Sequence, residues 1–297
     1  MRKLFLAFVI SSAIITLNSC GSDSGTDESN TGGDTTAVKE DTGSVAQKIF
    51  YSIPSPIELA QLIQKAGASY NKDLLNDIDN AAKYSSVNSK AINLGVYGSD
   101  LSYTSIFDQT QESILYLRCA KKLADGLGIS GAFTENTVDR MQANYGNQDS
   151  LLNIISDSYY TTDEYLKENQ RENTSALVIA GGWIEGLYIG TQLVRSTKDN
   201  SGIITRIAEM KGSLANLIAL LESYKSEEGA AEILSSLKAI QSVYDEMKIS
   251  DSKPEVKTDA KTRTTTIGGT SSYSLTTEQL NKITKLAEEL RAKIIKV

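Results

Sequence analysis

Two sets of polar residues interrupt the most hydrophobic parts of this chain, and their spacing places each set on one side of a helix. On the first, Glu185, Tyr188 and Gln192 follow one another at intervals of three or four residues. On the second, Tyr97, Asp100, Thr104, Asp108 and Gln111 do the same. Residues so spaced share a helical face. If the two faces meet, they line a polar interior pocket whose candidate members are Tyr97, Asp100, Asp108, Glu185, Tyr188 and Gln192.

The three carboxylates would carry the chemistry of such a pocket. Carboxylates that share a low-dielectric site have raised and coupled pKa values, or they hold a cation. A simpler alternative keeps Asp100 and Asp108 on a solvated face and satisfies Glu185 with one lysine or with backbone donors. A carboxylate in a sequence as apolar as that around Glu185 is costly to bury unpaired.

The residue types that the chain lacks argue against most familiar catalytic sets. It has no histidine, which argues against Ser-His-Asp and Cys-His catalysis, the usual catalytic zinc sites and histidine-ligated haem. Cys119 falls among leucines of a predicted helix, where a buried inert thiol is the default. No glycine-rich loop follows a predicted strand, so nucleotide binding has no support. We predict no catalytic residue, no metal site and no cofactor, with a carboxylate and tyrosine enzyme acting on a glycan as the alternative.

The stretch 175–195 must position Glu185 and its polar neighbours. Glu185 is its only charged residue between the ends, and a helix that is apolar on all sides is either a core helix or a membrane span. The interruption at Glu185 and the polar residues near the end of the stretch favour the core helix. Gly182, Gly186 and Gly190 recur every four residues, and we expect another helix to approach closely along this ridge without side chains.

The remaining apolar periodicity predicts an all-α fold, a single bundle of seven to nine helices over residues 49–297. Asp100 and its neighbours belong to a long helical pattern over 87–125, which Gly95 and Gly98 are able to bend or split. The residues that would form the pocket therefore lie on the two most hydrophobic helices of the bundle.

The ends of the predicted bundle carry recognisable start and stop signals. Asn71 is expected to cap a helix that continues to Ile78. The last helix has a clear start, because Thr276 and Gln279 form a capping box. No strand pattern competes, and the polar, threonine-rich residues 248–273 are predicted to be a mobile surface loop rather than a lid.

The first twenty residues have the layout of a secretory signal. A short basic start precedes an apolar run from Leu4 to Leu17 that is too short to span a membrane comfortably. The sequence LNSCG at 17–21 resembles the lipobox of bacterial lipoproteins. The resemblance implies removal of residues 1–19 and a lipid on Cys20 that anchors the chain to a membrane. Residues 20–48 are rich in Gly, Ser, Thr and Asp, which predicts a disordered tether.

Charge and a second resemblance bear on location and partners. Arg2 and Lys3 leave with the signal, so the formal charge falls from −7 to about −9, and such a surface repels nucleic acid. IPSP at 53–56 and LGVYGSD at 94–100 resemble uncharacterised helical lipoproteins of Bacteroidota. That resemblance implies the outer membrane of the cell envelope, on its periplasmic or surface face, and no mechanism.

We therefore expect a lipid-anchored module of the cell envelope that binds an envelope protein or a small ligand and is not an enzyme. The carboxylate-based glycan enzyme and a purely structural spacer are the alternatives.

Overall fold

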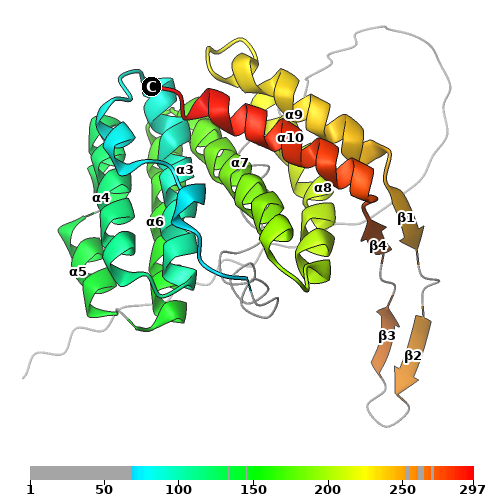
Figure 1. Cartoon of the computed structure of the whole chain (residues 1–297). Coiled ribbons are helices and arrows are strands. Elements are labelled where there is room, and N and C mark those ends of the chain that lie inside the picture. Colours follow the sequence, from blue (N-terminus) through cyan, green and yellow to red (C-terminus); the bar gives the residue numbers. More distant parts are fainter. Residues whose placement is uncertain (1–67, 133, 145, 252–254, 260–263, 269–270) are drawn as a thin grey trace, which may run out of the picture. The chain divides into compact units, whose positions relative to one another are not determined.

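The computed structural model describes residues 68–132, 134–144, 146–251, 255–259, 264–268 and 271–297, and within them the predicted all-α bundle is confirmed (Figure 1). The helices are η1 (Lys72–Leu74), η2 (Ile78–Ala82), α3 (Val87–Ile106), α4 (Thr110–Gly126), η3 (Ser130–Ala132), α5 (Glu135–Ala143), α6 (Gln148–Glu168), α7 (Glu172–Ser196), α8 (Ser201–Glu222), α9 (Ala230–Asp245) and α10 (Thr277–Ile294). The predicted signal peptide, Cys20 and the predicted tether lie outside the described residues.

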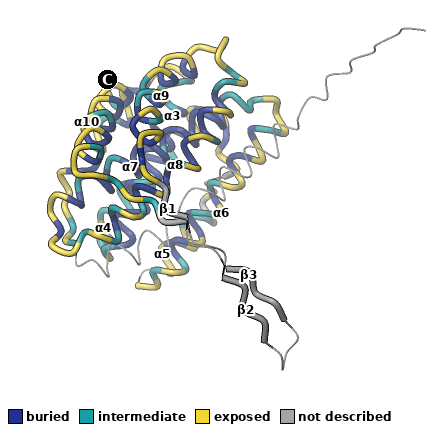
Figure 2. Tube along the Cα trace, turned by 90° about the vertical axis from the view of Figure 1, so that its right-hand side faces the viewer, coloured by how far each residue is buried: buried dark blue, intermediate teal, exposed yellow. Residues whose placement is uncertain are grey.

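Helix α7 is the centre of the bundle. It packs against α3, α6, α8 and α10, and most of its residues from Thr174 to Val194 are buried (Figure 2). Within the described part of the chain it is the one helix long and apolar enough to cross a membrane, but 78% of its most apolar window is buried inside the protein. This burial fits the core helix that the sequence favours.

The backbones of α3 and α7 touch at glycines. A Cβ atom on Gly95 would overlap the carbonyl oxygen of Val178, and one on Gly181 would overlap the carbonyl oxygen of Ile92. The predicted ridge is confirmed at Gly182, whose backbone oxygen accepts from the Ser99 hydroxyl of α3 at 3.0 Å. It is wrong at Gly186, because a Cβ on that residue would meet no atom within 4 Å. The closest approach to α3 is at Gly181, one residue before the expected ridge, and successive residues of a helix point about 100° apart.

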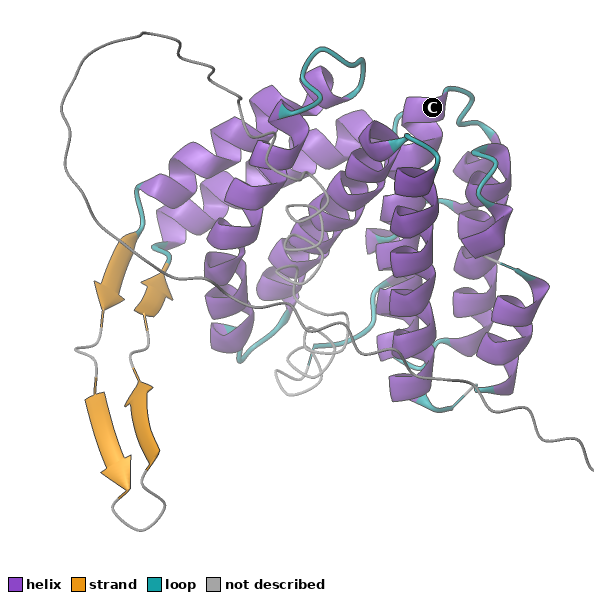
Figure 3. Ribbon diagram, turned by 180° about the vertical axis from the view of Figure 1, so that it is seen from behind, coloured by secondary structure: helices purple, strands orange, loops and turns teal. Residues whose placement is uncertain are grey.

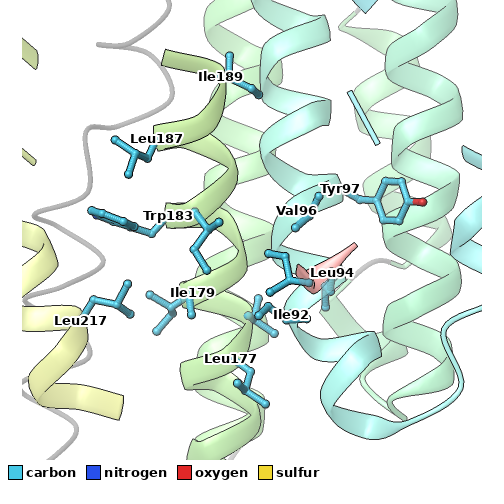
Figure 4. Close-up of a cluster of buried hydrophobic side chains, with 14 of the residues drawn as sticks. Ile92, Leu94, Val96, Tyr97, Leu177, Ile179, Trp183, Leu187, Ile189 and Leu217 are labelled. Carbon is cyan, nitrogen blue, oxygen red and sulfur yellow. The ribbon is translucent and has the colours of Figure 1, made fainter. Parts of the chain in front are cut away.

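Large apolar side chains fill the layers around this crossing. Trp183 and Leu187 extend from α7 toward Leu217 of α8, whereas Tyr97 points away from α7 (Figure 4). Trp183 is 1% exposed, and its indole N–H donates to the hydroxyl of Ser213 at 2.9 Å. Asp100 of α3 and Glu185 of α7, both 0% exposed, are enclosed by a largely apolar core.

The single long helix predicted over 87–125 is wrong, because α3 and α4 are separate helices that pack on each other. Between them Asp108 has a φ of 54°, a left-handed conformation that aspartate tolerates better than most residues and that a continuing helix does not use. Gly95 and Gly98, the predicted break points, remain inside α3. They provide space for neighbouring elements instead of a bend.

The prediction of a strandless loop over 248–273 is also wrong. β1 (Lys248–Asp251) pairs with β4 (Ser271–Ser274), and β2 (Glu255–Asp259) pairs with β3 (Thr264–Gly268), both antiparallel (Figure 3). The register sets Val256 opposite Ile267. Threonine, valine and isoleucine favour extended backbone. The stretch was predicted to be a loop because it is polar, but its threonines also favour strands.

The helices in the segment before α3 are shorter than the sequence pattern predicts. Asn71 does act as a cap, since its side chain accepts the Asp73 N–H at 3.0 Å, but η1 ends after one turn. Asp77 then caps η2 by accepting the Asp79 N–H at 2.9 Å. The predicted helix from Asn71 to Ile78 is therefore wrong, because the chain forms the short η1 and then a second 3₁₀ helix, η2, that begins only at Ile78. The capping box at Thr276 is confirmed.

Candidate functional site

The structure brings part of the predicted pocket together. Asp100 on α3 and Glu185 on α7 are both fully buried, and their carboxyl groups lie within hydrogen-bonding reach of each other. Tyr97 is fully buried one helical turn before Asp100. Tyr188 is partly buried on α7, one turn after Glu185.

Two of the candidates do not join this group. Asp108 is exposed in the turn between α3 and α4, because the helix that was expected to align it with Asp100 ends before it. Gln192 lies farther along α7, where its side-chain amide donates to Glu288 at 2.8 Å and its carbonyl accepts from Arg195 at 3.2 Å. Its contacts belong to an ion pair between α7 and α10.

Arg291 of α10 completes the buried group. Its Nε donates to Glu185 Oε2 at 3.0 Å and its Nη2 donates to Glu185 Oε1 at 2.9 Å. Nη2 also donates to the backbone oxygen of Leu74 at 2.9 Å. The guanidinium carbon lies 4.4 Å from the centre of the Tyr188 ring, a cation–π contact. Arg291 therefore joins α10, α7 and the segment before α3.

Asn76 is the second hub of the cluster, and it is 1% exposed. Its N–H donates to Asp100 Oδ2 at 3.1 Å. Its side-chain amide donates to the Tyr84 hydroxyl at 3.1 Å, and its backbone oxygen accepts from the Tyr116 hydroxyl at 3.1 Å. The Tyr97 hydroxyl donates to the backbone oxygen of Asp77, the residue after Asn76, at 2.6 Å. These bonds satisfy the backbone of an irregular segment that the core has buried.

Asn93 of α3 ties the same cluster to the end of α10. Its side-chain amide donates to the backbone oxygen of Ile294 at 2.9 Å, and the Tyr84 hydroxyl donates to the backbone oxygen of Ile295 at 3.0 Å. The last carbonyls of a helix have no partner within the helix. The cluster supplies partners for the carbonyls of Ile294 and Ile295 at the end of α10.

Burial dominates the electrostatics of the two acids. It raises the pKa of the Asp100 carboxyl well above its usual range; Glu185 adds to that rise, and Arg291 and the Asn76 N–H oppose it. Burial also raises the pKa of Glu185, and the adjacent Arg291 opposes the rise. Glu185 takes the direct ion pair and is the better site for a negative charge, so the two acids differ in their environments.

Sequence reasoning missed Arg291, although its position carried a signal. α10 buries Ile283, Ala287, Leu290 and Ile294, and Arg291 falls between the last two on the same face of the helical repeat. A charged residue on an apolar face calls for a buried partner, and Glu185 was the one acid already expected inside. Asn76 and Asn93 gave no comparable signal, because isolated asparagines are also common in turns and on surfaces.

The cluster offers little to an external substrate. Glu185 and Asp100 are 0% exposed, and the hydroxyls of Tyr97 and Tyr116 are bonded to backbone oxygens. Among the described residues, no group of three or more cysteine, aspartate and glutamate side chains is placed to hold a metal ion. The arrangement is suited to joining helices rather than to turnover.

Comparison with known proteins finds no matching family model, no matching curated protein and no matching solved structure. The functional argument therefore depends on the residues of this chain.

Proposed function

We propose that this chain is a lipid-anchored module of the cell envelope that binds a partner protein or a small ligand and has no catalytic activity. One observation carries the non-catalytic part of the proposal. The two acids that could have acted on a substrate, Asp100 and Glu185, are fully buried, and Glu185 is paired with Arg291. The acids at the centre of the helical domain thus serve its packing.

The anchoring part of the proposal is supported by the sequence. The basic start, the apolar run and LNSCG at 17–21 occur in the order that lipoprotein signals use. In bacterial lipoproteins, which this pattern resembles, the cysteine after the cleavage site carries the lipid. Cys20 would hold the chain on the outer membrane, and the polar residues up to 48 would let the helical domain reach partners on the same membrane.

The glycan-enzyme alternative is less well supported by the geometry. Hydrolysis of a glycosidic bond uses two carboxyl groups on opposite sides of a bound sugar, separated by roughly 5–10 Å. Asp100 and Glu185 instead lie in hydrogen-bonding reach of each other with no exposed surface. Asp108, the exposed acid of the predicted set, is placed outside this pair.

Substitution of the two cysteines tests the anchor. Cys20→Ala should remove the lipid and shift the protein out of the membrane fraction or leave the precursor uncut. Cys119→Ala is the matched control, since Cys20 and Cys119 are the chain's two cysteines, and it should leave lipidation unchanged. Mass spectrometry of the N-terminal peptide and membrane fractionation provide the readouts. A lipid that persists in Cys20→Ala would contradict the assignment.

Partner binding and catalysis are tested on the same purified protein. Cross-linking in intact cells should recover a defined envelope component with wild type and with Asp100→Asn, because the buried acid does not take part in binding. Incubation of wild type with cell-wall glycan should release no reducing sugar above a heat-denatured control. Glycan release that Asp100→Asn or Glu185→Gln abolishes in a folded protein would overturn the proposal in favour of an enzyme.

A further inference from the structure

The buried cluster contains two acids and one base. Asp100 and Glu185 are 0% exposed, and Arg291 is 9% exposed. With both acids ionised the group would carry a net charge of −1 inside the core. An unbalanced charge at such a depth is strongly disfavoured, and a buried acid commonly takes up a proton instead.

The hydrogen-bond partners of the carboxyl oxygens indicate which acid holds that proton. Both oxygens of Glu185 accept from Arg291, and Oδ2 of Asp100 accepts from the Asn76 N–H. No donor among the described residues reaches Oδ1 of Asp100. The carboxyl groups of Asp100 and Glu185 are hydrogen-bonded to each other, and Oδ1 is the Asp100 oxygen that is left without a donor. Two ionised carboxylates cannot form such a bond, because neither has a hydrogen to donate.

We propose that Asp100 holds a proton on Oδ1 at neutral pH and donates it to the Glu185 carboxylate, forming a protonated clamp that loosens when the pH rises. In the neutral state Asp100 is uncharged and Glu185 is balanced by Arg291. Loss of the proton to solvent leaves two negatively charged carboxylates next to each other, and the single guanidinium of Arg291 balances only one of them. The repulsion acts where α3, α7, α10 and the segment at Asn76 meet, so these elements lose their attachment together.

The other titratable groups around Asp100 do not replace this proton. Tyrosine and cysteine side chains face it from α3, α4, α6, α7 and the segment before α3; they are Tyr84, Tyr97, Tyr116, Cys119, Tyr159 and Tyr188. Burial raises the pKa of each of them. They are therefore uncharged at neutral pH, and Arg291 is the positive charge that faces Asp100.

The sign of the pH effect follows from linkage. An aspartate in the unfolded chain releases its proton near pH 4, whereas Asp100 in the folded chain keeps it to a higher pH because burial raises its pKa. Between those two values the folded state binds one more proton than the unfolded state. Its stability therefore falls as the pH rises, and the unfolding constant grows about tenfold per pH unit from this group.

Asp100→Asn removes the titration while keeping the shape, because the amide N–H₂ replaces the proton toward Glu185. The ratio of the unfolding constants of wild type and Asp100→Asn, measured by urea denaturation of the full chain, should rise about tenfold per pH unit above pH 4 and level off at the folded pKa. A ratio independent of pH would overturn the proposal.

Asp163→Asn is the matched control. Asp163 is another buried acid, but its oxygens have their own donors, Ser175 at 2.5 Å and Lys167 at 2.6 Å. Removal of this charge should leave the alkaline loss of stability as in wild type. If Asp163→Asn and Asp100→Asn reduced the loss of stability at high pH equally, net charge and not the shared proton would be the cause of the pH dependence.

A spectroscopic measurement detects the proton directly, and its wild-type spectrum does not depend on whether a variant folds. Infrared spectra of wild type labelled with ¹³C-aspartate should show one protonated aspartic acid at pH 7, which disappears at higher pH together with the loss of stability. No protonated aspartic acid at pH 7, or one that Asp100→Asn leaves in place, would overturn the assignment to Asp100.

Discussion

The contact between α3 and α7 can be tested with two glycines of the same helix. Gly181 and Gly186 both lie inside α7, so replacing either with alanine gains about 1 kcal/mol of helix propensity. Their surroundings differ. A Cβ on Gly181 would overlap the backbone oxygen of Ile92, whereas a Cβ on Gly186 would meet no atom within 4 Å.

The expected magnitudes follow from that difference. Overpacking costs about 1–3 kcal/mol, and the upper end applies to Gly181→Ala because the overlapped atoms belong to the backbone of α3 and cannot rotate away. After the gain in propensity, we expect Gly181→Ala to lose about 2 kcal/mol and Gly186→Ala to gain up to about 1 kcal/mol. For a domain of this size those changes correspond to melting points about 4–8 °C lower and about 2–4 °C higher.

Thermal melts of the full chain, followed by circular dichroism, measure both variants against wild type. Because the two substitutions have the same chemistry in the same helix, their difference isolates the helix contact. A Gly181→Ala protein that melts at or above Gly186→Ala would refute the placement of Gly181 against α3.

Two further predictions concern single groups. Burial raises the pKa of Cys119 to about 11, so only about one molecule in a thousand carries the reactive thiolate at pH 8. In the Cys20→Ala chain, iodoacetamide should therefore react slowly with Cys119 until urea unfolds the protein. Fast labelling of the native protein would contradict the burial. Thr276→Ala should lower the free energy of unfolding by about 1 kcal/mol in urea denaturation, because it breaks the capping box. Thr277→Ala, one residue later on the exposed first turn, should stay within about 0.5 kcal/mol of wild type. Equal losses in the two variants would contradict the capping role.

Sequence periodicity was sufficient for the helical class, because amphipathic spacing reports which face a helix buries. It also brought out Asp100 and Glu185, since acids inside apolar stretches are conspicuous. Periodicity could not place Asp108, because the break between α3 and α4 depends on one residue in a left-handed conformation. It identified Gly182, which meets α3, but it could not tell that Gly181 lies closest to α3 or that a Cβ on Gly186 would meet open space, since neighbouring faces of a helix differ by a single residue.

The partner of Glu185 required tertiary structure. Arg291 is 106 residues away in the chain, and no local rule connects the two. The Asn76 contacts were hidden for a related reason, because they satisfy the backbone of an irregular segment that has no periodicity. The strands at 248–273 were missed because threonine-rich sequence resembles a loop when polarity alone is considered.

The claim that the buried cluster fastens α10 to the bundle is tested most directly by a pair of arginine substitutions. Arg291 and Arg195 both form ion pairs between α7 and α10, with Glu185 at 2.9 Å and Glu288 at 2.6 Å, but their side chains are 11% and 54% exposed. Urea denaturation at pH 7 should show Arg291→Met losing about 3–5 kcal/mol, because Glu185 is left buried without its partner. Arg195→Met should lose less than about 1 kcal/mol, as exposed pairs do. Equal small losses in the two variants would contradict the account.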